Sequence, residues 1–502
     1  MYINDLHKLT FNNYFDIISK YFVCIEFINY KLQKSTIIFK GGIFLRKLHF
    51  REKMYEARYL RNVIHTTLNP YGPGSVRIHM VPPKRTLNKE VPYLVFLNGS
   101  DILPIKISWA ILLSGFIEKV NLYEGKEITK EDLERIIRHT ITRTKKVYPS
   151  VSSKVLKNDL WRMIDSFVKI AYGEETDEDI GLLSINEYAS FMKAPHRMDL
   201  MISSMQKNGC WNCNQKCLHC YAADQKYAEV KELSTIHWKK VIDECRKIGI
   251  PQITFTGGEP TLRKDLTELI EYSKWFVTRL NTNGVLLTEE LCKQLYEASL
   301  DSVQITLYSN VPEIHNELVG AQNFEKTVAG IKNAVKAGLN VSINTPLCSL
   351  NSDYSSTLKF INELGVKYVS CSGLIPSGNA EKSESKATKI EESKMYEILK
   401  EAKEICDELH IEISFTSPGW VEEEKMRKLQ LSVPACGACL SNMAIAPNGE
   451  VIPCQSWLSS ESSLGNILND DWEDIWNSSK CETIRNRTVE LHNVCQLKEF
   501  NK

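Results

Sequence analysis

Short apolar runs alternate with longer amphipathic segments between Arg197 and Pro376, and this alternation limits the possible folds more than any other feature. The helical pattern is clear at 233–249 and 324–338, where apolar residues recur every three to four positions. Such alternation predicts an α/β fold in which right-handed helical crossovers join parallel strands, as a barrel or as an open doubly wound sheet. Six strands are expected, at 199–205, 252–258, 276–284, 302–309, 340–347 and 368–376.

The rest of the chain suggests three further parts. Residues 1–55 are rich in Ile, Phe, Tyr and Lys without a clear period and stay unassigned. Translation that begins near Met54, or a short amphipathic extension, would each account for them. Residues 56–196 predict a small α+β domain, with a strand that enters an Asn98-Gly99 turn and an amphipathic helix at 130–146. Residues 197–433 then form the core, and residues 434–502 a short segment rich in cysteine.

The 15 cysteines are too few for a disulfide scaffold and too clustered to be scattered core residues. Two soft-metal sites in a reducing cytoplasm account best for this distribution. The charges balance, with 62 basic and 62 acidic residues, which argues against a nucleic-acid partner or an anionic membrane. The longest apolar stretch, 107–117, is far short of the roughly 20 residues that span a bilayer, and we find no signal peptide.

Four cysteines lie between positions 210 and 220, and three of them have the spacing C-x3-C-x2-C in the loop after the first core strand. Three thiolates on one loop can bind three corners of a 4Fe-4S cluster and leave the fourth iron open. A closed zinc site would need Cys210 as well. The second core strand ends in Gly-Gly-Glu-Pro, where two glycines allow the backbone to approach a ligand and Glu259 offers an acceptor.

Together, these motifs resemble the radical S-adenosylmethionine (SAM) superfamily over about residues 197–380. The resemblance implies a partial (β/α)6 TIM-like barrel with a cluster on Cys213, Cys217 and Cys220, whose open iron takes the amino and carboxylate groups of SAM. His219 would pack near adenine, and Cys210 would have no ligand role. Outside the two main motifs, each polar position taken by itself fits a turn or core role nearly as well as a SAM contact. The implied SAM contacts are Gly257, Gly258, Glu259, Pro260, Asn283, Thr306, Ser309, Asn344 and Ile375.

The C-terminal segment places cysteines on both sides of an expected hairpin with Asn448-Gly449 at its tip. It resembles the SPASM extension, or its shorter form Twitch, which carries auxiliary 4Fe-4S clusters. A full SPASM domain continues with C-x2-C-x5-C-x3-C, whereas this chain has only Cys495 there. We therefore expect one auxiliary cluster, with Cys481 as an alternative ligand. The expected ligands are Cys436, Cys439, Cys454 and Cys495.

The resemblance implies reductive cleavage of SAM to a 5'-deoxyadenosyl radical that abstracts hydrogen. Enzymes with these domains mostly modify peptides, by thioether or carbon-carbon crosslinks, so we expect a peptide or protein substrate with a leader segment. Residues 91–147 could be a winged-helix element that captures the leader as an added strand. An external donor such as flavodoxin or ferredoxin would supply electrons.

Two alternatives remain open. Molybdopterin or haem biosynthesis uses similar short auxiliary domains, and a non-enzymatic iron-sulfur or zinc protein would leave the Gly-Gly-Glu-Pro loop without a purpose. No catalytic acid or base can be named from the sequence.

Overall fold

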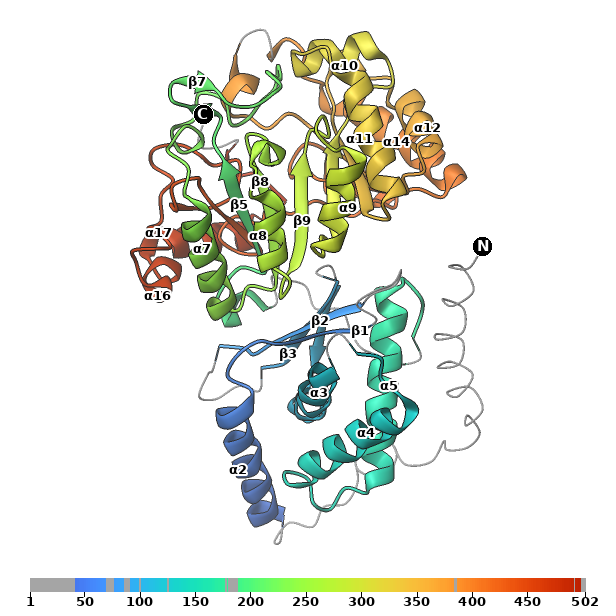
Figure 1. The fold of residues 1–502 in the computed structure, drawn as a ribbon, viewed down its shortest axis with the longest axis vertical. Coiled ribbons are helices and arrows are strands. Elements are labelled where there is room, and N and C mark those ends of the chain that lie inside the picture. Colours follow the sequence, from blue (N-terminus) through green and yellow to red (C-terminus); the bar gives the residue numbers. More distant parts are fainter. Residues whose placement is uncertain are drawn as a thin grey trace. The chain divides into compact units, whose positions relative to one another are not determined.

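The structure is a computed structural model, and it describes residues 41–68, 76–84, 91–98, 101–123, 126–176, 178, 188–382, 386–491 and 493–497 (Figure 1). Residues 1–40, which include Cys24, lie outside this description, and so does Gly99 of the expected turn. The chain divides into two compact units, Met1–Pro82 with Pro92–Leu182 and Pro83–Val91 with Leu183–Lys502. The second unit thus begins before residue 197, where we placed the start of the core.

Unit 1 combines an antiparallel sheet with helices. Its four strands lie in the order β1-β2-β3-β4, and Asn98 has a positive φ of 50° in the β3–β4 turn. The core lies between the sheet and helices α3, α4 and α5, where Val95, Ile111 and Phe167 are fully buried. The elements are α2 (Gly41–Tyr59), β1 (Ile64–Leu68), β2 (Val76–Val81), β3 (Tyr93–Leu97), β4 (Asp101–Ile105), α3 (Ile107–Val120), α4 (Lys130–Lys145) and α5 (Ser153–Ala171).

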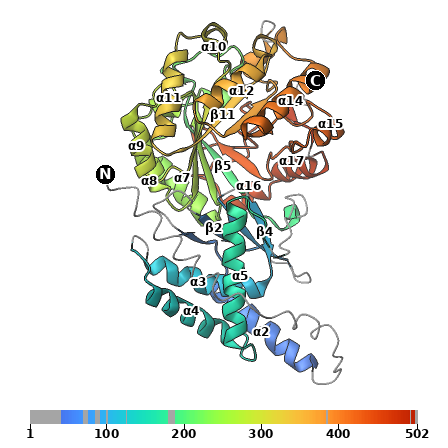
Figure 2. The same ribbon diagram turned by 90° about the vertical axis from the view of Figure 1, so that its right-hand side faces the viewer.

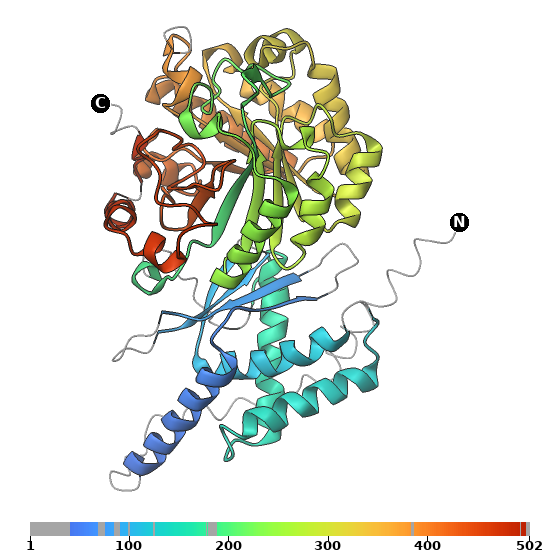
Figure 3. The same cartoon turned by 60° about the vertical axis from the view of Figure 1, so that its left-hand side comes forward.

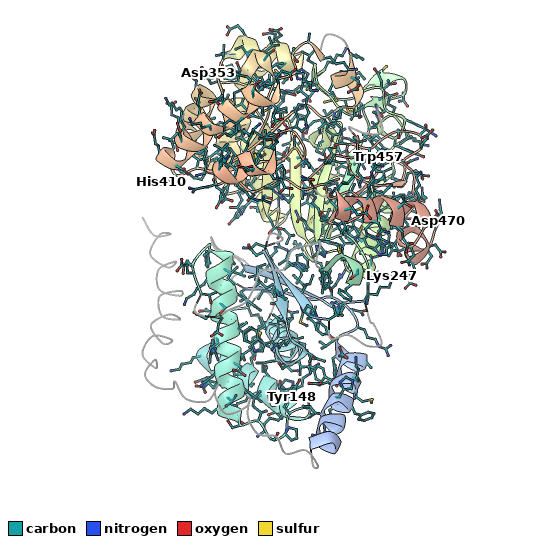
Figure 4. The ribbon with its side chains drawn as sticks, turned by 180° about the vertical axis from the view of Figure 1, so that it is seen from behind. Tyr148, Lys247, Asp353, His410, Trp457 and Asp470 are labelled. Atoms are coloured by element: carbon teal, nitrogen blue, oxygen red, sulfur yellow. The ribbon has the colours of Figure 1, made fainter. Side chains whose placement is uncertain are left out.

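Tyrosine hydroxyls attach helix α2 to the rest of unit 1. Tyr148, labelled in Figure 4, follows α4 and donates a 2.7 Å hydrogen bond to Glu52 Oε1. Tyr93 on β3 donates a 2.8 Å hydrogen bond to Glu56 Oε1. Helix α2 is therefore held at two points, one turn apart, by carboxylates that face the unit.

The central sheet of unit 2 confirms the expected barrel. Its strands follow the order β13-β12-β11-β10-β9-β8-β5-β14-β15, and β5 and β8 to β13 pair in parallel in their order along the chain. A doubly wound sheet would reverse this order at a switch point, so the single direction identifies a partial barrel. The parallel strands are β5 (Arg197–Ser203), β8 (Gln252–Gly257), β9 (Val277–Thr282), β10 (Ser302–Thr306), β11 (Asn340–Pro346), β12 (Tyr368–Ser372) and β13 (Glu412–Phe415).

Helices cover one face of this sheet (Figures 1 and 2). Strands β10 and β11 alternate between buried and more exposed residues, and Val303, Ile305 and Ile343 are among the fully buried ones. Polar residues such as Gln304 and Asn344 occupy the other face, which is the barrel interior. The helices are α7 (Thr235–Ile248), α8 (Leu266–Tyr272), α9 (Glu289–Glu297), α10 (Pro312–Val319), α11 (Phe324–Lys336), α12 (Tyr354–Glu363), α14 (Glu392–Leu409) and α15 (Glu423–Lys428).

The C-terminal segment joins the barrel sheet directly. Strand β14 (Asn442–Ile445) pairs in parallel with β5, and β15 (Val451–Ile452) returns antiparallel to it, with Gly449 at a φ of 92° in the turn (Figure 3). Two helices follow, α16 (Trp472–Trp476) and α17 (Ser479–Glu490). Strand β5 leads into the first cysteine loop, and β14 pairs with it. The cysteines of the C-terminal segment are therefore positioned against the same strand.

None of the described helices is long and apolar enough to cross a membrane. The apolar stretch at 107–117 forms the start of α3, whose buried residues belong to the core of unit 1.

Candidate metal centre

The first cysteine loop follows β5 and begins with a small hairpin, β6 (Gln206–Lys207) and β7 (Cys210–Trp211). Cys210 lies on this hairpin and is exposed, whereas Cys213, Cys217 and Cys220 are partly buried. Burial raises the pKa of the Cys213 thiol to about 12, and the nearby Glu259 and Cys220 contribute to this rise. Burial also raises the pKa of Cys217, with added contributions from Cys220 and Cys213. The loop therefore gathers three thiols, and Cys210 faces solvent.

The surroundings of the three thiols fit an iron-sulfur cluster with a polar ligand. Among the described residues, no three His, Cys, Asp or Glu side chains form a site for a single ion. Four buried polar atoms in or beside the loop have no hydrogen-bond partner within the described residues: Ser203 Oγ, Asn214 Nδ2, His219 Nδ1 and Asn379 Oδ1. Such atoms are rare in folded proteins, and they suit the amino, carboxylate and hydroxyl groups of SAM.

Gly257 and Gly258 lie where β8 ends against β5. Gly257 has a φ of 135°, and a Cβ atom there would lie 2.3 Å from the Ser203 carbonyl oxygen. A Cβ on Gly258 would lie 2.8 Å from the Ser204 carbonyl oxygen. Only glycine permits this close approach of the two strands, which brings the Gly-Gly-Glu-Pro turn beside the cysteine loop.

Glu259 binds the ends of two strands together. Its buried carboxylate accepts hydrogen bonds from the Thr261 amide (3.0 Å) and hydroxyl (2.6 Å), and from the Thr282 hydroxyl (2.6 Å). These three bonds reach Oε1, and the second carboxylate oxygen, Oε2, accepts a hydrogen bond from the Asn283 amide at 2.8 Å. Burial raises the pKa of this carboxyl, and the hydrogen bonds oppose the rise. We expected an acceptor for SAM, and the structure shows that most of its capacity is used within the protein.

The remaining predicted SAM contacts lie along the carboxyl ends of β9 to β12. Asn283 Nδ2 donates to Asn214 Oδ1 at 2.6 Å, which links β9 to the cysteine loop. Thr306 and Asn344 are paired residues on β10 and β11 and are both partly exposed. The Ser309 hydroxyl accepts from the Val311 amide, which is a local turn contact. Ile375 follows β12 and is partly exposed.

The segment after β12 packs directly on the cysteine loop. The Asn379 amide donates to the Cys220 carbonyl at 2.9 Å, and its side chain donates to the Cys217 carbonyl at 3.0 Å. Gly378 has a φ of 59°, and a Cβ atom there would lie 2.5 Å from the same Cys220 carbonyl. These contacts hold the backbone between Cys217 and Cys220, and sequence patterns gave no sign of them.

His219 is buried within the same region. Its Nε2 forms a 2.8 Å hydrogen bond with the Thr388 hydroxyl, and its ring lies 6.4 Å from that of Tyr308. Thr388 and Ile390 are buried, although the stretch around them is polar and charged. The signal available was the apolar Ile390 within a polar stretch.

His315 predicts a pH dependence of stability. Its ring is fully buried, its Nδ1 accepts from the Tyr308 amide at 3.3 Å, and burial lowers its pKa to about 4. Because an unfolded histidine titrates near 6.5, this contribution to stability is complete above about pH 6.5 and is lost as the pH falls toward 4. Between pH 6.5 and 5 we expect a loss of about 2 kcal/mol. His315→Gln keeps an acceptor, so its melting temperature should fall less over this range, and an equal fall would contradict the assignment.

The C-terminal cysteines form a second group. Burial raises the pKa of Cys454, and the neighbouring Cys436 and Cys495 add to the rise. Cys439 is fully buried beside Cys481, and this neighbour holds the pKa of the Cys481 thiol below its usual value. Arg485 Nη1 also donates to Cys481 Sγ at 3.5 Å. The structure therefore brings the expected Cys436, Cys454 and Cys495 together, with Cys439 beside Cys454, and it adds a contact between Cys439 and Cys481 that spacing did not indicate.

Tyr221 lies between the two cysteine groups. Its ring packs in an apolar cluster with Cys213 and Cys220 from the first loop and with Ile452 and Leu458 from the C-terminal segment. Burial raises the pKa of its hydroxyl, and Cys220, Asp199 and Cys454 raise it further. The sequence offered no means to choose this residue among 20 tyrosines.

Comparisons with known proteins agree with this arrangement. Residues 212–353 match the radical SAM superfamily, and residues 436–497 match the SPASM iron-sulfur cluster-binding domain. An AdoMet-dependent heme synthase of Methanosarcina barkeri is 28% identical over 58% of this chain and 86% of its own length. The mycofactocin maturase MftC of Mycolicibacterium smegmatis is 27% identical over 53% of this chain and 68% of its own length.

A solved structure shares most of the fold. SuiB of Streptococcus suis, bound to the precursor peptide SuiA, superposes with a TM-score of 0.56 at 12% identity. The superposition covers 82% of this chain and 94% of that chain. It therefore extends well beyond the residues that the two domain matches cover.

Proposed function

We propose that this chain, which carries a radical SAM domain followed by a SPASM domain, is a radical SAM enzyme that modifies a peptide. The observation that carries the proposal is unit 1, a four-stranded antiparallel sheet with three packed helices ahead of the barrel. SuiB has a similar fold over most of this chain and was solved with a precursor peptide. A heme synthase relationship alone would leave much of the chain without a role, because that similarity covers only 58% of it.

The leader of the peptide would pair with β4. This strand lies at one edge of the sheet, so among the described residues its backbone pairs with β3 alone. At the opposite edge, the side chain of Asn121 donates to the His65 carbonyl on β1 at 2.8 Å, which occupies part of that edge. An extended peptide gains main-chain hydrogen bonds when it adds to an edge strand. Residues 91–147 would thus form the recognition element, as the sequence suggested.

The residues of the barrel would hold the cofactors and exclude water. Cys213, Cys217 and Cys220 would hold the cluster, and the unpaired atoms of Ser203, Asn214 and Asn379 would meet SAM. When bound, the reduced cluster and SAM supply abstraction of a hydrogen atom from an unactivated C-H bond. Glu259 and Asn283 fix the strand ends around this site through their hydrogen bonds. Of the predicted contacts, Gly257, Gly258, Pro260, Thr306, Ser309, Asn344 and Ile375 would line it.

The test is to express the protein together with short peptides encoded beside its gene, and to measure intact peptide masses. A crosslink requires the loss of two hydrogen atoms from the peptide. This loss should depend on the first cysteine group and should disappear when Ile102→Pro, at the second position of β4, removes a backbone donor from that strand. No mass change with any neighbouring peptide, together with turnover of a tetrapyrrole, would favour haem-type chemistry instead. The heme synthase relative makes that the second candidate.

We further propose one auxiliary cluster on Cys436, Cys439, Cys454 and Cys495. In a background that lacks the first cysteine group, Cys495→Ala should reduce the remaining iron from about four atoms per chain to less than about one. Cys481→Ala should keep most of it, because the Cys481 thiol accepts a hydrogen bond from Arg485, whereas Cys436 and Cys495 lie beside Cys454. Iron analysis and electron paramagnetic resonance would check both variants, and the reverse result would assign Cys481 as the ligand.

A further inference from the structure

The interior face of the barrel carries an arginine on β9. Along this strand Thr278, Leu280 and Thr282 are buried, whereas Arg279 and Asn281 are partly exposed. Residues that alternate along a strand lie on opposite faces of a sheet. Arg279 and Asn281 therefore project to the interior, on the face that the helices leave uncovered.

Arg279 lies in a row of polar residues that crosses the sheet. Its neighbour on β8 is Thr254, whose neighbour on β5 is Asp199, and its neighbour on β10 is Ser302. Asp199 is 1% exposed and forms an ion pair with Arg197, with 3.1 Å between Arg197 Nε and Asp199 Oδ1. The single carboxylate of this row is thus already paired with one arginine.

The guanidinium of Arg279 has no such partner. Among the described residues it forms neither a hydrogen bond nor an ion pair. Burial lowers its pKa, Arg197 lowers it further, and Asp199 only opposes these effects. Two arginines against one carboxylate leave one positive charge on this part of the interior. A partly buried cation without a protein acceptor is less well solvated than one at the surface, so a fold retains one most readily where a ligand supplies the acceptor.

We infer that Arg279 binds a carboxylate of the substrate inside the barrel. The planar guanidinium presents paired N-H donors that match a carboxylate. The inference rests on the proposed function, and the carboxylate is that of an acidic side chain or the C-terminus of the peptide. Arg279 precedes Thr282 by three residues, or about 10 Å along the strand. The carboxylate would therefore anchor the peptide below the cofactor site, with the reacting C-H bond nearer the strand ends.

Binding of two small probes to the anaerobic holoprotein tests this inference. The probes are N-acetylglutamate methylamide and its glutamine counterpart, which differ only in the side-chain carboxylate. SAM is kept at a saturating concentration, so that its own carboxylate is bound before either probe is added. Calorimetry or saturation-transfer NMR should give the glutamate probe at least about 10-fold tighter binding. Arg279→Gln should reduce this preference to less than about 2-fold. Arg279→Lys should keep an intermediate preference, because lysine retains the positive charge but not the paired N-H donors of the guanidinium.

Arg246→Gln is the matched control, since Arg246 is exposed on α7 and stacks on Trp275. It removes the same charge outside the interior and should leave the preference unchanged, with iron content and circular dichroism confirming that both variants fold. Equal binding of the two probes by the wild type, or a preference that survives Arg279→Gln, would overturn the inference. A third probe, a porphyrin with propionate chains, separates the two proposals. If only the porphyrin binds in an Arg279-dependent manner, the carboxylate site stands and the peptide assignment is wrong.

Discussion

A variant with Cys213, Cys217 and Cys220 all changed to alanine is expected to lose reductant-dependent formation of 5'-deoxyadenosine entirely. The three thiols lie together on one loop, and their side chains pack into two apolar clusters. Cys348 is the one other described cysteine in these clusters, and it is fully buried. Without them the chain has no ligands for the first cluster. Iron should fall from about eight to about four atoms per chain, because the auxiliary cluster remains. Anaerobic reconstitution, iron and sulfide analysis and chromatography of the products would measure these changes.

Cys210→Ala is the control for this variant. Cys210 belongs to the same stretch of sequence but is exposed on the β6–β7 hairpin, so its removal should change neither iron content nor SAM cleavage. If the triple variant still cleaved SAM, or if zinc replaced iron in the wild type, the cluster assignment would be wrong. If Cys210→Ala behaved like the triple variant, Cys210 would have to be a ligand, as in a closed four-thiol site.

The barrel could be predicted from the sequence because its signals are local. Apolar strand runs and amphipathic helices have different periods, and each of the six expected strands is present in the structure. The seventh parallel strand, β13, was not predicted. It is only four residues long, Glu412–Phe415, and its first residue is exposed, so it lacks the apolar run of a central strand.

The packing around the cysteine loop could not be predicted, because it joins residues far apart in the chain. The contacts of Asn379 with Cys217 and of Thr388 with His219 span more than 160 positions. Polar side chains in a charged stretch carry no period that indicates burial. The same limitation applies to Glu259, because the sequence identifies an acceptor but not the four donors that the fold brings to it.

The cysteine pair at the C-terminus shows where spacing is informative and where it fails. The expected hairpin with Asn448-Gly449 at its tip predicts that Cys439 and Cys454 lie near each other, and in the structure the Cys439 amide donates to the Pro453 carbonyl at 3.1 Å. Cys481 lies on α17, and its distance from Cys439 depends on how that helix packs. The structure places the two thiols beside each other, a result of tertiary packing that no turn rule encodes.

Gly257→Ala is expected to be the most destabilising single substitution among the site residues. A φ of 135° is unfavourable for any residue with a Cβ atom, and that atom would lie 2.3 Å from the Ser203 carbonyl oxygen and 2.8 Å from the Ser203 amide nitrogen. Ser203 and Gly257 are paired residues of β5 and β8, so backbone and not a flexible side chain would have to move. We expect a loss of more than about 4 kcal/mol, which would lower the melting temperature by roughly 8 °C or more, together with loss of SAM binding.

Gly209→Ala separates the cost of backbone conformation from the cost of this contact. Gly209 has a φ of 75° in the β6–β7 turn, but a Cβ atom there would meet nothing within 4 Å. Its expected cost is only about 1 to 2 kcal/mol, since the left-handed conformation is the sole penalty, and SAM binding should persist. Similar losses in the two variants would show that conformation alone explains the effect. A much larger loss in Gly257→Ala would instead show that the close approach of β8 to β5 holds the cofactor turn in place.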